Sequence, residues 1–195
     1  VLKGARMLFV YKDQMVALST VEGTYTGTDA IFHTNRARWS QNGTVFFSNP
    51  VPVNQTAQFD AWRSDIPGKG GFTDAPTSEA IVGAEFIRDT LIVFFERSTW
   101  ALRYTGTPAT PFEWIRVNVE FGCESQFSVI PFDRGVLAVG DRAIITADGN
   151  NVSRIDLKIP DIVFDFQNSS NGPERVYGIR DYFNELVYWT WVSPD

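Results

Sequence analysis

Residues 90–106, TLIVFFERSTWALRYTG, decide the fold class. They contain two extended runs, Leu91–Phe95 and Thr99–Tyr104, joined by residues 96–98. The second run alternates apolar and polar with period two, as in a half-buried strand. The first is apolar on both sides and rich in β-branched and aromatic residues, as in a strand covered on both faces. We therefore expect an antiparallel hairpin, the basic unit of an all-β fold.

The same pattern recurs along most of the chain. Extended runs are separated by Gly, Asn, Asp or Pro turns, and no segment keeps a helical period. The pair Asn42-Gly43 favours a type I′ hairpin turn, whose two central residues both need a positive φ. The other predicted strands are Ala5–Val10, Met15–Val21, Arg36–Ser40, Thr44–Phe47, Ile81–Arg88, Glu113–Val119, Ser128–Phe132, Val136–Val139, Ala143–Thr146, Val152–Ile155, Asp161–Gln167, Arg175–Ile179 and Leu186–Trp191.

Residues 49–80 break this pattern. They hold four of the ten prolines and a Gly-Lys-Gly-Gly cluster. We predict a long loop insertion, anchored by Trp62 and Phe72, within a single β domain over residues 1–195. Loops of this length in compact domains are often functional or contact-forming. Because the chain starts at Val1 and ends on a turn sequence after a predicted strand, we expect it to be an excerpt of a longer polypeptide.

Three segments share one layout, an extended run, a turn containing Asp and a second run. Their turn residues are Asp89, Asp133 and Asp181, and a similar segment near the N-terminus contains Asp13. Self-similarity at about 40–50 residues is the period of a β-propeller blade. The repeat predicts a β-propeller or partial propeller of antiparallel blades, and a β-sandwich is the alternative.

Composition narrows the function classes. The 195 residues are 44% hydrophobic and include 16 Phe, 6 Tyr and 6 Trp, which is typical of an ordered chain with a substantial core. The formal net charge of −6 argues against a basic nucleic-acid-binding surface. The lone Cys123 forms no internal disulfide, and no apolar run reaches the length of a membrane span.

Candidates for catalysis are few. His33 is the only histidine, so a nucleophilic triad would have to use it, and no nucleophile elbow surrounds it. Cys123 is better interpreted as a small buried residue, and a zinc site needs more Cys and His than the chain has. Asp148-Gly149 resembles part of a calcium loop but lacks the full series of oxygen ligands, so we favour a turn. We predict no enzymatic activity, cofactor or metal.

Three aromatic residues lie in or near predicted loops, namely Trp62, Phe72 and Trp114. Exposed rings there could form platforms for a carbohydrate or a subunit interface. Core packing or loop anchoring is the favoured interpretation.

Four motifs in order carry a resemblance to a known family. They are ARWS at 37–40 followed by Asn-Gly, LIVFFERSTWALRYTG at 91–106, FGCESQFSV at 121–129 and AIITADGNNVSRI at 143–155. Together they resemble propeller-containing bacteriophage tail proteins, of the tail nozzle (tubular) type or the head–tail hub type that stabilises packaged DNA. The family-signature positions, which we expect to be structural, are Arg38, Trp39, Ser40, Glu96, Arg97, Ser98, Tyr104, Gly106, Gly122, Cys123, Asp148 and Gly149.

The resemblance implies a structural virion component in a ring of identical subunits around the DNA path, made in the host cytoplasm. Its implied partners are copies of itself, other tail or portal-adjacent proteins, and DNA that passes without tight binding, with no membrane involved. The alternative is a glycan-binding β module with Trp62 and Trp114 as platforms. A propeller hydrolase of the sialidase kind ranks third, because its S-x-D-x-G-x-T-W signature is absent.

Overall fold

The computed structural model describes residues 2–24, 27–45, 60–159, 164 and 176–191. These residues confirm the all-β fold class, since fourteen strands account for most of their regular structure. Helical structure in the described ranges is limited to short 3₁₀ turns, among them Asp60–Trp62 and Gln126–Ser128.

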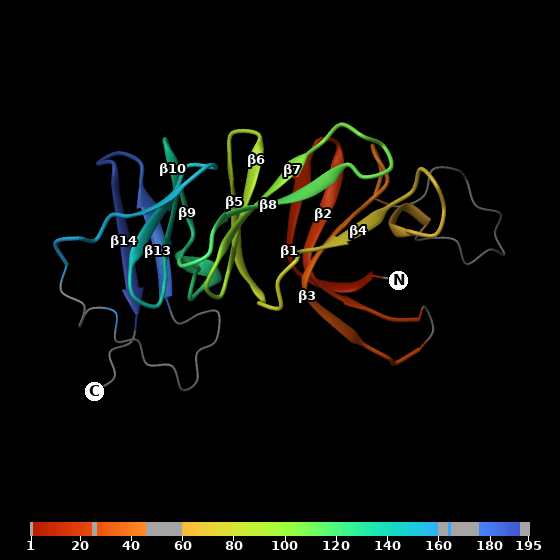
Figure 1. The fold of residues 1–195 in the computed structure, drawn as a ribbon, viewed down its shortest axis with the longest axis horizontal. Helices are drawn as coiled ribbons and strands as arrows, with labels where there is room; N and C mark the ends of the chain where they lie inside the picture. Colours follow the sequence, from red (N-terminus) through yellow and green to blue (C-terminus); the bar gives the residue numbers. More distant parts are fainter. Residues whose placement is uncertain (1, 25–26, 46–59, 160–163, 165–175, 192–195) are drawn as a thin grey trace. The chain divides into compact units, whose positions relative to one another are not determined.

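Each of the four sheets is antiparallel, and all strand neighbours in these sheets are consecutive in the chain (Figure 1). The sheet orders are β1-β2-β3-β4, β5-β6-β7-β8, β12-β11-β10-β9 and β13-β14. The strands are β1 Leu2–Tyr11, β2 Gln14–Glu22, β3 Ile31–Trp39, β4 Gly71–Asp74, β5 Ile81–Ile87, β6 Thr90–Phe95, β7 Thr99–Tyr104, β8 Phe112–Asn118, β9 Ile130–Phe132, β10 Gly135–Val139, β11 Ile144–Ala147, β12 Val152–Arg154, β13 Val176–Asp181 and β14 Leu186–Trp191.

The chain divides into two compact units, and the prediction of a single domain over residues 1–195 stays a prediction. Unit 1 comprises residues 1–80 and 104–113, and unit 2 comprises residues 81–103 and 114–195. Unit 1 contains the sheet β1–β4. Its first hairpin turns through Lys12 and Asp13, whose φ values of 49° and 62° match a type I′ turn.

One strand of unit 1 was missed by the sequence analysis. The Asn42-Gly43 turn is present, with a Gly43 φ of 72°, but Thr44 and Val45 form no strand after it. Residues 46 and 47 of the predicted strand lie outside the described residues. The partner of β3 is instead β4, which lies inside the predicted loop insertion 49–80. This long-range pairing has no short-range turn signal.

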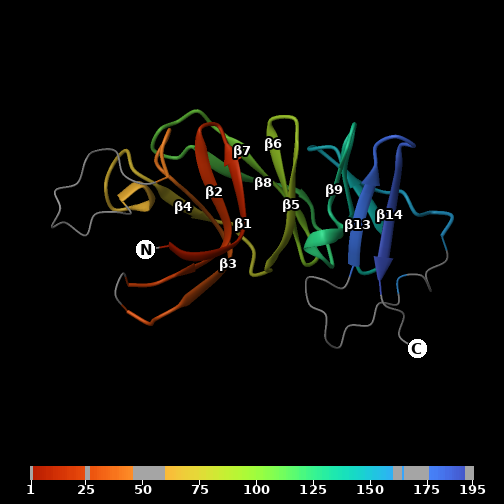
Figure 2. The same cartoon turned by 180° about the vertical axis from the view of Figure 1, so that it is seen from behind.

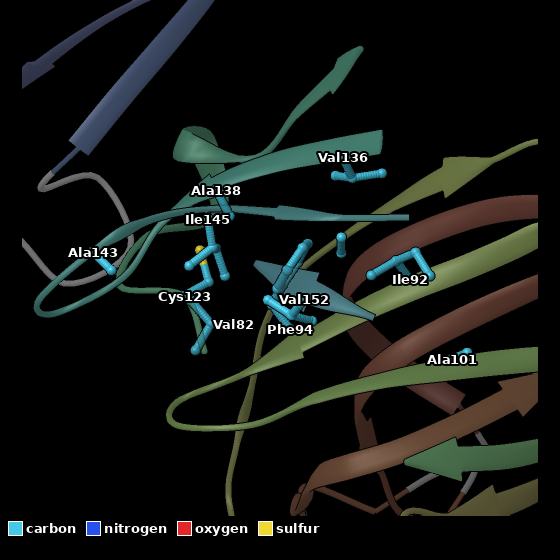
Figure 3. Close-up of a cluster of buried hydrophobic side chains, with 11 residues drawn as sticks. Val82, Ile92, Phe94, Ala101, Cys123, Val136, Ala138, Ala143, Ile145 and Val152 are labelled. Atoms are coloured by element: carbon cyan, nitrogen blue, oxygen red, sulfur yellow. The ribbon is translucent and has the colours of Figure 1, made fainter. Parts of the chain in front are cut away.

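Unit 2 contains three sheets that pack face to face in chain order (Figure 1). Between β5–β8 and β9–β12 lies a core that includes Ile92, Phe94, Val136 and Ile145. In Figure 3 the Cys123 thiol lies beside Ile145 and Val82 in this core.

The sheet β9–β12 buries both of its faces within unit 2. Val136 and Ala138 on β10 face the core shared with β5–β8. Val139 and Ile144, which are opposite each other in the register, belong to a second core with Val176 of β13. Strand alternation therefore makes this sheet a layer between two others.

Most predicted strands match observed ones within about two residues, the usual uncertainty of strand ends. The prediction of a strand over Ser128–Phe132 was partly wrong, because a 3₁₀ turn ends at Ser128 and β9 starts at Ile130. The predicted strand Asp161–Gln167 lies outside the described residues except for Phe164, which is buried in the second core.

Candidate functional site

A group of charged side chains joins strands β2, β3 and β4 of unit 1. Arg36 and Arg38 on β3 are only 8% and 6% exposed. The Glu22 carboxylate accepts a hydrogen bond from Arg38 at 2.8 Å and lies 3.3 Å from the Arg36 guanidinium. Arg36 donates two bonds to Asp74 at 2.6 and 2.8 Å, and its guanidinium lies 3.9 Å from the centre of the Phe72 ring. We call these five residues the arginine cluster.

The pKa values of the arginine cluster favour the fully charged state. Burial raises the pKa of Glu22, but the Arg38 charge, the Thr20 hydroxyl and Arg36 outweigh burial, so that pKa is lowered. Hydrogen bonds from Arg36 lower the pKa of Asp74, and the same bonds raise the pKa of Arg36. Two buried guanidiniums thus require both carboxylates, and the cluster ties three strands together.

Ser40, the last residue of the ARWS motif, connects β3 to the first hairpin. It is fully buried, and its hydroxyl accepts a hydrogen bond from the Met15 backbone at 3.0 Å. The Gln14 side chain donates to the Ser40 carbonyl at 2.8 Å. These contacts are structural ones.

Trp39 and Tyr104 belong to one aromatic group in unit 1. Phe112 lies at its centre, with ring centroids 5.5 Å from Trp39, 5.1 Å from Tyr11 and 5.7 Å from Tyr104. The Tyr104 backbone N–H donates to the Tyr11 hydroxyl at 3.2 Å. Gly106 follows in a turn with a φ of 76°, a value that favours glycine.

The Glu-Arg-Ser signature forms the turn between β6 and β7. Ser98 is 4% exposed, and its carbonyl accepts a hydrogen bond from the Phe95 N–H at 2.8 Å. The Trp100 indole donates to the Ser98 hydroxyl at 3.0 Å. Glu96 and Arg97 are exposed. The serine therefore holds the turn, while the two charged residues face solvent.

Gly122 and Cys123 lie against the end of β6. A Cβ at Gly122 would come within 2.3 Å of the Phe95 carbonyl oxygen, so only glycine fits there. That oxygen accepts a hydrogen bond from the Cys123 N–H at 2.9 Å. The Cys123 thiol donates to the Ser125 carbonyl at 3.0 Å and lies 3.2 Å from the Ser128 hydroxyl. The thiol is 1% exposed and acts as a core residue.

Asp148 and Gly149 form a turn stabilised by the aspartate side chain. The Asp148 carboxylate accepts hydrogen bonds from the backbone of Asn150 and Asn151 at 2.9 and 2.8 Å, and these bonds lower its pKa. Gly149 has a φ of 96°. Arg103 on β7 donates to the Asn150 side chain at 3.0 Å. The turn interpretation of this motif accounts for its geometry.

The three proposed aromatic platforms make intramolecular contacts. Trp62 is half-buried and its indole donates to the Val45 carbonyl at 3.0 Å. Phe72 is 43% exposed but lies under a guanidinium of the arginine cluster. Trp114 is half-buried and packs edge-on against Phe95 at 5.8 Å. Each ring thus anchors local structure, and ligand or interface roles for them stay predictions.

His33 is half-buried on β3, opposite Thr20 and close enough to Asp74 to help lower the pKa of that carboxyl. Across the described ranges, no group of three or more His, Cys, Asp or Glu side chains is placed to hold a metal ion. None of the helical turns described is long and apolar enough to cross a membrane.

Unit 2 has an open hollow of about 480 Å³, a volume within the range of small-ligand sites. Its lining residues are mostly charged and include Arg97, Val119, Glu120, Phe121, Asp141, Arg142 and Arg154. Arg154 donates two hydrogen bonds to Asp156, whose side chain is fully buried, so this guanidinium is held in place. The lining combines both signs of charge with one aromatic ring.

Sequence reasoning missed the hollow and the partners of Arg38. Arg36 could have been found, because it lies two residues before Arg38 and strand alternation puts both on one face. Glu22 and Asp74 lie on other strands, and no local sequence pattern indicates that they pair with the two arginines.

No protein-family model matches the sequence, and a search of curated proteins finds no match. The fold is that of an all-β protein built from consecutive antiparallel sheets. Unit 1 contains the buried arginine cluster, and unit 2 contains the hollow lined by charged residues.

Proposed function

We propose that this protein is a structural component of a bacteriophage virion, a tail nozzle or head–tail hub protein whose subunits surround the DNA path. The observation that carries the proposal is the face-to-face packing of three successive antiparallel sheets in unit 2. Consecutive strands that form successive packed sheets are the arrangement of propeller blades. The four-motif resemblance to propeller-containing tail proteins supports the same assignment.

The contacts of the family-signature residues support a structural role. Ser98 and Gly122 shape the region where β6 ends, and Cys123 fills the core beside it. Arg38 and Ser40 tie β3 and the residue after it to β2. These residues hold strands and turns in place, which suits a rigid scaffold.

The proposal is tested in particles of the phage whose genome encodes this sequence. Antibodies raised against the purified chain should label the tail or the head–tail junction in immunogold electron microscopy. A nonsense mutation in the gene should yield particles that lack this label and have defective tails. The proposal would be contradicted if the antibodies did not label wild-type particles and if mass spectrometry did not detect the protein in them.

The hollow of unit 2 favours glycan recognition as a second candidate function. Guanidinium and carboxylate groups form paired hydrogen bonds with polar ligands, and Phe121 offers an apolar surface beside them. A glycan array probed with the labelled chain would support this function if Glu120→Ala abolishes a saturable signal. An array signal that the substitution leaves unchanged would count against it.

A further inference from the structure

The Asn42-Gly43 pair forms an exposed β-turn just after β3, the third strand of the sheet β1–β4 (Figure 2). The Thr44 N–H donates to the Gln41 carbonyl at 3.4 Å, so Asn42 and Gly43 are the two central residues of the turn. Both are exposed, and Gly43 has a φ of 72°. The turn therefore presents the Asn42 amide side chain to solvent directly before a glycine.

An asparagine in this position can lose its side-chain amide without a catalyst. The Gly43 nitrogen gives up its proton to solvent and bonds to Cγ of Asn42, while the bond from Cγ to the side-chain nitrogen breaks and ammonia leaves. Water then opens the resulting cyclic imide at either carbonyl, which gives aspartate or isoaspartate. Glycine permits the attack because it has no Cβ beside the nitrogen, and a Cβ at Gly43 would meet no described atom within 4 Å.

A comparable turn in unit 2, Asp148-Gly149, is protected by its own hydrogen bonds. Gly149 also has a positive φ, of 96°. The Asp148 carboxylate, however, accepts bonds from the Asn150 and Asn151 backbone at 2.9 and 2.8 Å, which lower its pKa and keep it ionised. An ionised carboxylate held in this way is a poor target for a nitrogen nucleophile. Of these two turns, the one at Asn42 is therefore the reactive one.

Two backbone hydrogen bonds hold the Asn42-Gly43 turn in place. The Gly43 N–H donates to the Asp13 carbonyl at 2.7 Å, and the Gln41 N–H donates to the Ala61 carbonyl at 2.6 Å. The bond to Asp13 occupies the proton that the reaction has to remove, and it joins the turn to the β1–β2 hairpin. The reaction therefore requires this part of unit 1 to open locally.

We infer that Asn42 is a site of spontaneous deamidation and that the hydrogen bond from Gly43 to Asp13 controls its rate. The product adds a negative charge to a chain that is already acidic. Isoaspartate also adds an atom to the backbone of the turn, which displaces the Gly43 N–H from the Asp13 carbonyl. Because water is the only co-reactant, the reaction does not depend on the proposed virion function.

The inference is tested by incubating the chain of residues 1–195 in water enriched in heavy oxygen, in native buffer and in guanidinium chloride. Digestion with trypsin in ordinary water is followed by mass spectrometry of peptide 39–63. Asn42 should exchange its amide for a labelled carboxyl group under both conditions. Opening two backbone hydrogen bonds predicts a native rate at least roughly tenfold below the unfolded rate. Both rates should rise with pH, because the attacking nitrogen has to lose its proton.

Two controls assign the product to Asn42. The variant Asn42→Gln should lack it, because the longer side chain cyclises poorly. The chain has a second Asn-Gly pair, Asn171-Gly172, which lies outside the described residues. It falls in the separate tryptic peptide 159–175, so its reaction does not interfere.

Ser40→Ala tests the control by local opening. The buried Ser40 hydroxyl accepts a hydrogen bond from the Met15 N–H at 3.0 Å, next to the turn. Its loss should loosen this end of β3 and raise the native rate at Asn42 several-fold, while the rate in guanidinium chloride stays the same. Ser153→Ala is the matched control, because this serine is exposed and lies in unit 2, and both of its rates should equal those of the wild type.

Four outcomes would overturn the inference. They are equal rates in the native and the unfolded chain, no product under either condition, a native rate in Ser40→Ala no higher than in Ser153→Ala, and incorporation of heavy oxygen at Asp148 as fast as at Asn42.

Discussion

Neutralising Glu22 should destabilise unit 1 through the arginine cluster. The Glu22 side chain is 12% exposed and interacts with both Arg36 and Arg38. Removing one partner of a buried ion pair typically costs about 3–5 kcal/mol. In Glu22→Gln, Arg36 keeps its two bonds to Asp74 and Arg38 keeps its bond to the Trp62 carbonyl. Because both guanidiniums keep these partners, we expect Glu22→Gln to lower the free energy of unfolding by about 2–3 kcal/mol, at or below the lower limit of that range.

The assay is urea unfolding at pH 7, followed by tryptophan fluorescence and far-ultraviolet circular dichroism. The matched control is Asp65→Asn, which breaks the exposed pair formed by Arg63 and Asp65 at 2.5 Å. Solvent screens an exposed pair of this kind, so this control should unfold close to the wild type. An equal effect of the two substitutions would refute the assignment of the cluster as a buried network.

The pH dependence provides a second test of the same network. The pKa values of Glu22 and Asp74 are lowered in the folded chain, so folding is favoured by their charged forms. Their stabilisation is present above the unfolded pKa values, about 4.3 and 3.9, and is lost as the pH falls through the lower folded values. Glu22→Gln should therefore flatten the acid side of the stability profile. A profile parallel to that of the wild type would contradict this.

Other positions give further predictions for the same unfolding assay. Gly122→Ala should cost roughly 2–4 kcal/mol, because its Cβ would collide with backbone, whereas Gly4→Ala, with only one contact at 3.9 Å, should be nearly neutral. Equal losses of stability in the two glycine variants would argue against the close approach of Gly122 to the Phe95 backbone. Asp148→Ala should cost about 1 kcal/mol, because two turn N–H groups lose their acceptor, and a neutral result would exclude a stabilising role for that side chain. Ser125→Ala should cost about 1–2 kcal/mol, since its buried hydroxyl donates at 2.8 Å to a β13 carbonyl, while the exposed Ser153→Ala should stay within about 0.5 kcal/mol. Similar values for the two serines would refute the importance of that bond.

Local patterns predicted the hairpins because their determinants are close in the chain. The runs of β6 and β7 are three residues apart and pair directly, as Leu91 opposite Leu102 shows. The turn at Lys12 and Asp13 likewise joins strands that are adjacent in sequence and in the sheet. The fold class could therefore be predicted from alternation alone.

The partner of β3 could not be predicted in this way. The Asn42-Gly43 pair does adopt a turn, and the Gly43 N–H donates to the Asp13 carbonyl at 2.7 Å. The edge of β3 is nevertheless paired with β4, across a long intervening segment. Local sequence patterns predict pairing between strands that are close in the chain. They do not predict that β4, after a long loop, pairs with β3.

The environments of individual side chains likewise depend on tertiary contacts that local sequence does not specify. The sequence predicts a structural role for Arg38, but its partner Glu22 is fixed only when β2 and β3 align. The exposure of Tyr188 also could not be predicted, because Trp189, the next residue, has a similar character and is partly covered. Alternation says that neighbours face opposite ways and does not say which face is covered.

By itself, the sequence determined the all-β class, the positions of the short hairpins and the turn roles of residues such as Asp148 and Gly149. Backbone geometry and side-chain alternation act over a few residues, so local sequence is enough to specify them. The tertiary structure alone decided which sheets stack, where buried guanidiniums meet carboxylates and which apolar faces stay exposed. Those features depend on contacts between residues far apart in the chain, and only the folded arrangement specifies them.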